Sequence, residues 1–123
     1  MKEIVWVLKS DYANEVRFQS YRKKHERELI SCLANLNNLL HALNMGLSLQ
    51  EALGLGFFRS EGENIYRIGQ SGVAHAKETR LYVYARITGP DIQILTIGDK
   101  KSQQRDIDWC KRLVRRFDGE NDF

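Results

Sequence analysis

The sequence predicts a single α+β domain in which helices pack on one face of a mostly antiparallel sheet. Three observations lead to this fold class. A short apolar run stands near the start, at residues 4–8. Helical periodicity follows over residues 29–43, and strand periodicity recurs between residues 64 and 97. Strand patterns that are separated from helix patterns along the chain are typical of α+β proteins.

The size and composition fit one globular domain over residues 1–123. The chain has 123 residues, 42% of them hydrophobic and 28% charged, which excludes a disordered or fibrous protein. No apolar run approaches the roughly 20 residues of a membrane helix, and no secretory signal is recognisable. We therefore expect a cytoplasmic protein without a membrane partner.

The first expected elements are a strand and a helical hairpin. The run Ile4-Val5-Trp6-Val7-Leu8 is short and apolar, as in a buried strand. Ser10 or Asp11 can cap the helix that follows. The second helix carries leucines at spacings of three and four, all on one face: Leu29, Leu33, Leu36, Leu40 and Leu43. We place the turn within residues 22–28, but neither glycine nor proline marks it, so one long helix is the alternative.

A short helix comes next. Gly46 is a C-terminal cap for the leucine helix. Ser48 and Glu51 form a capping box, in which each side chain accepts a hydrogen bond from a backbone donor. Because a capping box marks the start of a helix, it predicts a short helix that begins after Ser48 and ends at Gly54. Residues 59–64 are polar and indicate a turn.

From residue 64 the period changes to two, which predicts an antiparallel meander of three strands. The strands are expected at residues 64–70, 79–87 and 92–97, and residues 88–91 form the turn between the last two. A final helix is expected over residues 102–117, where apolar positions recur with helical spacing. Together these elements complete the predicted α+β fold.

Positive charge is clustered although the net charge is only +3. Residues 22–28 are rich in lysine and arginine, and residues 100–116 hold seven lysines and arginines against two aspartates. A clustered positive field favours a polyanionic partner, whereas a solvated helix face gives the same count. The charge therefore supports nucleic acid as a partner only in combination with other features.

Residues 79–87 carry the most informative pattern. Strand alternation places four apolar side chains on one face, namely Leu81, Val83, Ala85 and Ile87. The other face carries two arginines and two tyrosines about 7 Å apart, namely Arg80, Tyr82, Tyr84 and Arg86. We expect helices to cover the first face and to leave the second partly open.

The second face suits nucleic acid. Guanidinium groups bind phosphate in bidentate fashion, and tyrosine rings stack on unpaired bases. Arg67 on the neighbouring strand would extend the row, and Lys100 and Lys101 would close it at one end. Exposed sheet faces also carry tyrosine and arginine simply because these residues suit a half-solvated surface.

No metal site or cofactor site is indicated. His25 and His41 have neither cysteine nor carboxylate partners at metal-binding spacing. His75 stands in a loop, where a histidine is commonly only solvated. Cys32 and Cys110 are too few for a disulfide framework, so we interpret them as reduced packing residues.

Residues 94–107, Ile-Leu-Thr-Ile-Gly-Asp-Lys-Lys-Ser-Gln-Gln-Arg-Asp-Ile, resemble the closing strand and helix start of HigB- and RelE-like toxins of bacterial addiction modules. Residues 64–68 and 79–82 look like the second and third strands of that family. The helical hairpin matches in order and length. The resemblance covers nearly the whole chain, although only residues 64–107 carry recognisable sequence. It implies a RelE/ParE-like fold.

The resemblance also implies an activity. Such toxins are ribosome-dependent endoribonucleases that cut messenger RNA, in which the ribose 2′-OH attacks the phosphate and leaves a 2′,3′-cyclic end. They need neither a metal nor a small-molecule cofactor, and a cognate antitoxin protein holds them inactive. The implied partners are therefore the antitoxin, messenger RNA and the ribosome.

By resemblance, the candidate catalytic residues are Arg67, Arg80 and Lys100. The candidate RNA-binding residues are Tyr82, Tyr84, Arg86, Lys101, His75 and Lys77. RelE itself has a tyrosine in the last helix region, whereas residues 102–117 contain neither tyrosine nor histidine. Tyr82, Tyr84 or His75 would have to substitute. We expect Arg80→Ala to abolish toxicity without affecting folding, because a solvent-facing side chain contributes little to the core.

Two alternatives stay open. The chain can be a ParE-like inhibitor of DNA gyrase without nuclease activity, or an inactive relative that only binds an antitoxin. The nuclease hypothesis depends on one geometric inference, namely that Arg80, Tyr82 and Tyr84 share an open face with Arg67 and Lys100. If helices cover that face, the proposed pocket does not exist and the hypothesis loses its basis.

Overall fold

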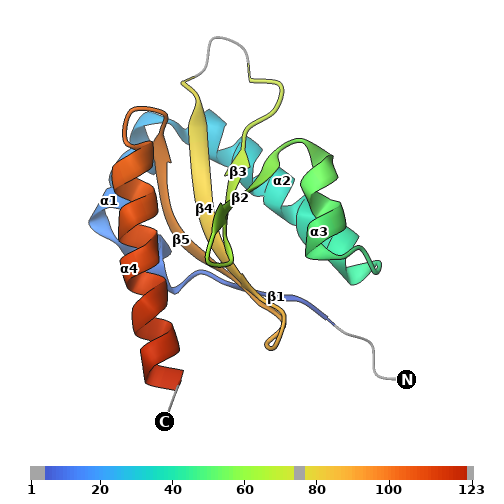
Figure 1. The fold of residues 1–123 in the computed structure, drawn as a ribbon. Coiled ribbons are helices and arrows are strands. Elements are labelled where there is room, and N and C mark those ends of the chain that lie inside the picture. Colours follow the sequence, from blue (N-terminus) through green and yellow to red (C-terminus); the bar gives the residue numbers. More distant parts are fainter. Residues whose placement is uncertain (1–4, 74–76, 122–123) are drawn as a thin grey trace.

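The computed structural model describes residues 5–73 and 77–121. Its strands form one mixed five-stranded sheet in the order β1-β5-β4-β3-β2. Figure 1 shows α4 on one side of this sheet and α2 with α3 on the other. The α+β class predicted from the sequence is confirmed, but the sheet has one strand more than expected and helices cover both of its faces.

The N-terminal half contains one strand and most of the helices: β1 Val7–Lys9, η1 Asp11–Asn14, α1 Val16–Lys24, α2 Glu26–Asn44, α3 Leu49–Ala52 and η2 Leu53–Leu55. The C-terminal half contains β2 Phe58–Gly62, β3 Ile65–Gly69, β4 Thr79–Arg86, β5 Asp91–Asp99 and α4 Gln103–Asn121. β1 pairs with β5 in parallel, and all other neighbours are antiparallel.

The first strand differs from the expectation of a buried element. β1 starts at Val7 and lies at the sheet edge, and its three side chains are exposed. Ile4, with which the predicted strand began, lies outside the described residues. An apolar run favours a strand but does not show where in the sheet that strand pairs, and the partner of β1 lies more than 80 residues further along the chain.

The helical hairpin is confirmed. α1 and α2 are separate helices, and His25 between them has a non-helical backbone (φ −135°, ψ 50°). The leucine face of α2 is shifted slightly from the expectation, because Leu39 and Cys32 are fully buried whereas Leu33 is 38% exposed. The capping box of α3 is also confirmed: Ser48 Oγ accepts a hydrogen bond from the Glu51 backbone, and the Glu51 carboxylate accepts one from the Ser48 backbone.

The prediction of a turn over residues 59–64 was wrong. Residues 58–62 form β2, and only Glu63 and Asn64 turn, both with positive φ (54° and 61°). β2 is an edge strand that pairs with β3 alone. A strand at the edge buries few side chains, so its polar sequence resembles that of a turn.

Two hydrophobic clusters hold the layers together. One lies between the sheet and α1, α2 and α3. The other joins the opposite sheet face to α4 and consists of Ile65, Tyr82, Tyr84, Leu95, Ile107, Cys110, Leu113 and Val114. Burial raises the pKa of the Cys32 and Cys110 thiols to about 12, and both cysteines are free, as expected for reduced packing residues.

An ion cluster fixes the turn between β4 and β5. Arg86 donates from Nε to Asp91 Oδ1 at 2.9 Å and from a terminal nitrogen to Oδ2 at 2.5 Å. Lys9 of β1 adds a contact at 3.2 Å. These hydrogen bonds hold the pKa of the buried Asp91 carboxyl below its ordinary value of 3.8, with Arg86 as the main cause. The cluster therefore ties β1 to β4 and β5.

This cluster predicts an acid-dependent stability. Asp91→Asn should lower the free energy of unfolding by about 1–3 kcal/mol at pH 7, because charged hydrogen bonds are lost. The pKa of Asp91 is lower in the folded protein than in the unfolded chain. The contribution of Asp91 to the free energy of unfolding is therefore complete above the ordinary pKa of 3.8 and is lost as the pH falls through the folded-state pKa. Urea unfolding across pH would check this, and an equal loss in the variant at pH 2 and pH 7 would contradict it.

Candidate anion-binding site

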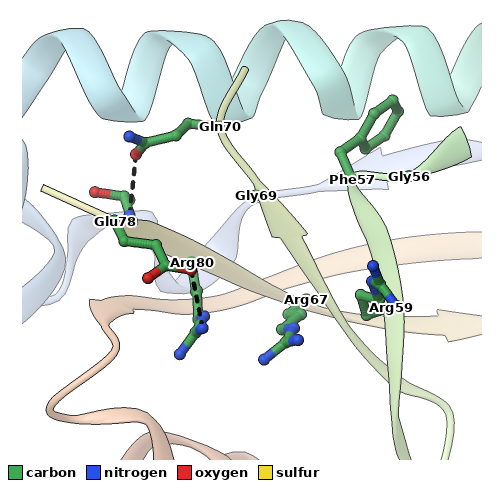
Figure 2. A pocket seen from close by; sticks show the side chains of 9 residues that line it. Gly56, Phe57, Arg59, Arg67, Gly69, Gln70, Glu78 and Arg80 are labelled. Atoms are coloured by element: carbon green, nitrogen blue, oxygen red, sulfur yellow. Dashed lines mark hydrogen bonds and ion pairs between the residues drawn. The ribbon is translucent and has the colours of Figure 1, made fainter. Parts of the chain in front are cut away.

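Three arginines from three neighbouring strands line one cavity. Arg59 of β2 lies directly opposite Arg67 of β3 in the register, so both side chains occupy the same face. Arg67 in turn lies opposite Tyr82, which is two residues from Arg80 on β4. Strand periodicity therefore places Arg80 on that face as well. Figure 2 shows the three arginines in a row across the strands.

The cavity, here called the arginine pocket, has a volume of about 210 Å³. This is about seven times the share of one molecule in liquid water, which leaves room for a phosphate group. Its lining residues are Gly56, Phe57, Arg59, Arg67, Gly69, Gln70, Glu78, Thr79 and Arg80. Glu78 is the one carboxylate among these nine, so positive charge predominates in the pocket.

The arginines differ in how firmly they are held. Arg80 donates to the Gln103 side chain at the start of α4 and, at 3.2 Å, to Glu78, and its side chain is only 10% exposed. Arg67 lies 3.4 Å from the Glu61 carboxylate and is 26% exposed. Arg59 is exposed, and within the described part of the chain it has neither an ion pair nor a side-chain hydrogen bond. The pocket therefore has a fixed inner end and an accessible rim.

The tyrosines expected beside these arginines are buried instead. Tyr82 has no exposed surface and Tyr84 retains 5%, because α4 packs over both. The ring centroid of Tyr84 lies 6.2 Å from that of Phe117 on α4. Burial also raises the pKa of Tyr82 far above its ordinary value. The expectation of an open arginine–tyrosine face was therefore wrong, and the pocket expected between these tyrosines, Arg67 and Lys100 does not exist. The arginine pocket is a different site, because neither tyrosine lines it.

The remaining predicted residues are dispersed. Lys100 and Lys101 are exposed in the turn between β5 and α4, and neither lines the arginine pocket. Lys77 pairs with Asp99 at 3.0 Å. Arg86 lies at the other end of β4 from Arg80. His75 falls outside the described residues. Of the predicted catalytic residues, the structure brings together Arg67 and Arg80, and Lys100 lies apart from them.

Arg59 was missed by the sequence reasoning. Its segment had been interpreted as a turn, so strand alternation was not applied to it. The sequence carries little signal for this strand, because Phe58 is followed only by polar residues up to Glu61 and burial along β2 does not alternate. A strand of this kind is recognisable only once its partner is known.

The expectation behind the Arg80→Ala prediction was wrong. Arg80 was expected to face solvent and to contribute little to folding. It is instead 9% exposed, and it links the start of β4 to α4 through Gln103. Removal of such a buried charged donor costs stability as well as any binding function. Arg67 and Arg59, which are more exposed, are the better positions for separating binding from folding.

Comparisons with protein-family models, with curated proteins and with solved structures give no match. Within residues 5–73 and 77–121, no three histidine, cysteine or acidic side chains gather as a metal site would require. No helix in these ranges has both the length and the apolar character needed to cross a membrane. The arginine pocket is therefore the feature from which a function can be argued.

Proposed function

We propose that this protein is a toxin of the RelE and HigB type that binds RNA and holds one backbone phosphate between Arg59, Arg67 and Arg80. The observation that carries the proposal is the convergence of three guanidinium groups on one small cavity. Guanidinium groups stay charged at all physiological pH values and bind phosphate oxygens in pairs. The RelE/ParE-like topology, the cytoplasmic location and the antitoxin and ribosome partners belong to the same proposal, on the resemblance of residues 94–107.

Two carboxylates contact the arginines of the pocket, and a phosphate is able to take their place. In the free protein, Glu78 bonds to Arg80 and Glu61 lies beside Arg67. The Glu78 side chain is 62% exposed, so breaking its ion pair costs little. A phosphate would replace these carboxylates, while Gln103 keeps the Arg80 guanidinium in place. Donors held in position in this way stabilise the charge that develops on the non-bridging oxygens during cleavage.

The pocket also offers a base for 2′-OH attack. None of its lining residues is a tyrosine or histidine, and Lys100 lies outside it. Glu78 is the lining residue able to accept the 2′-OH proton. The 2′-oxygen then bonds to phosphorus, the bond to the 5′-oxygen breaks, and water protonates the leaving oxygen. This assignment replaces the role that the sequence had given to the tyrosines.

Arg67→Ala and Arg59→Ala test the proposal. Each substitution removes charged hydrogen bonds to phosphate, so RNA binding should weaken roughly 10- to 100-fold. Toxicity on overexpression should disappear in parallel, whereas the thermal unfolding temperature should change little. Arg115→Ala is the matched control, because Arg115 likewise pairs with a glutamate of the β2–β3 hairpin, at 2.8 Å from Glu63, but lines no described cavity. Full RNA binding by Arg67→Ala would refute the proposed site.

A ParE-like inhibitor of DNA gyrase is the second candidate. The observation that favours it is the burial of Tyr82 and Tyr84, which leaves neither tyrosine available for base stacking and Phe57 as the one aromatic residue that lines the pocket. Overexpression with separate measurements of translation and DNA supercoiling distinguishes the two functions. Arrested translation with cut messenger RNA supports the nuclease, and relaxed or broken DNA supports gyrase as the target. Unimpaired growth supports an inactive relative.

A further inference from the structure

We infer that a second, larger basic cavity binds the backbone of the same RNA strand next to the arginine pocket. This inference rests on the proposed function. The cavity has a volume of about 630 Å³ and lies between α1 and the turn that joins β5 to α4. Its lining residues are Val16, Arg17, Ser20, Tyr21, Lys24, His25, Lys77, Gly98, Asp99, Ser102 and Arg105.

The lining has a surplus of positive charge. Four of its residues are lysines or arginines, and Asp99 is its one carboxylate. Arg17 is neutralised by the buried Asp106, and Lys77 by Asp99 at 3.0 Å. The other two cations, Lys24 and Arg105, are exposed and enter no ion pair within the described ranges. They are therefore available to an anion that enters the cavity.

The two cavities are direct neighbours. Thr79 lines the arginine pocket, and its Oγ1 lies 2.8 Å from the hydroxyl of Tyr21, which lines the second cavity. Lys77, two residues before β4 begins, lines the second cavity, and Arg80 of β4 lines the arginine pocket. Three residues of extended chain span only about 10 Å. A single RNA strand is therefore able to reach from one cavity to the other.

The ridge between the cavities is basic as well. The turn between β5 and α4 has Ser102 in the lining of the second cavity and Gln103 bonded to Arg80 on the other side. Lys100 and Lys101 are exposed in this turn. Positive side chains thus continue from the arginine pocket over the ridge to Lys24 and Arg105. This arrangement gives Lys100 and Lys101 a backbone-binding role rather than a catalytic one.

The double variant Lys24→Ala/Arg105→Ala tests the second site with two synthetic RNAs, a trinucleotide and a single strand of about 12 nucleotides. The variant should bind the trinucleotide as the wild type does and the longer strand about tenfold more weakly at low salt. Two lost phosphate contacts should also reduce the slope of log affinity against log salt by about 1.4. Circular dichroism should show unchanged folding, since both side chains are exposed.

Arg22→Ala/Lys23→Ala is the matched control. It removes the same charge from exposed positions on α1 that do not line the cavity, and it should retain most of the affinity for the longer strand. An equal loss in both double variants would indicate a diffuse field and overturn the inference. Wild-type affinity of Lys24→Ala/Arg105→Ala for the longer strand would also overturn the inference. The proposed function would still stand in that case if Arg67→Ala no longer binds either RNA. A wild-type protein that binds neither RNA would overturn the inference and the proposed function together.

Discussion

Tyr82→Ala is expected to lower the free energy of unfolding by about 3–5 kcal/mol. Tyr82 is completely buried between β4 and α4, where it packs in a cluster with Leu95 and Cys110. Its truncation would remove apolar contacts and leave a cavity that a close-packed layer cannot readily close. Urea unfolding followed by circular dichroism measures the loss.

Tyr82→Phe separates packing from hydroxyl chemistry. The Tyr82 hydroxyl is buried and finds no hydrogen-bond partner among the described residues. Its removal should leave stability unchanged or raise it by up to about 1 kcal/mol, because an unsatisfied polar group disappears. Toxicity should be retained. If Tyr82→Ala were instead as stable as the wild type but lost RNA binding, the residue would face a ligand, and the covering of this sheet face by α4 would be wrong.

Gly98→Ala is expected to destabilise the fold by about 2–4 kcal/mol. A Cβ atom on Gly98 would lie 2.6 Å from Ser102 Oγ and closer still to the Asp106 carboxylate. Asp106 has no exposed surface and is held by Arg17 and by Ser102, whose Oγ donates to it at 2.6 Å. A shift of the carboxylate away from the added methyl group would therefore disturb its contacts with Arg17 and Ser102. The contacts of the buried Asp106 carboxylate explain why a glycine stands at this point of the run over residues 94–107.

Gly54→Ala is the control for this substitution. A Cβ atom on Gly54 would meet no heavy atom within 4 Å, so the variant should be nearly as stable as the wild type. Thermal unfolding of both variants gives the comparison. A Gly98→Ala protein that unfolds at the wild-type temperature would show that the Asp106 network does not constrain the turn between β5 and α4.

Local signals in the sequence determined a large part of this fold. The capping box at Ser48 and Glu51 depends on nearest neighbours alone, and it is present. The turn within residues 22–28 had no local marker, and the structure places it at His25. Period-two alternation correctly grouped Arg80 with Tyr82 and placed Arg67 on the adjacent strand. Local hydrogen bonding and alternation are properties of a few consecutive residues, and they can therefore be read without the tertiary structure.

The tertiary structure alone decided which of these groups face solvent. The periodicity of an amphipathic helix shows which of its faces is buried, but it does not show against which face of the sheet the helix packs. The stripe of α4 packs on the side of the sheet opposite α2, so it covers Tyr82 and Tyr84 and leaves Arg67 near the uncovered edge. The pairing of β2 with β3 then adds Arg59. Long-range packing and strand pairing place these residues. The sequence therefore predicted Arg67 and Arg80 as site residues, but it predicted neither Arg59 nor the cavity that the three arginines line.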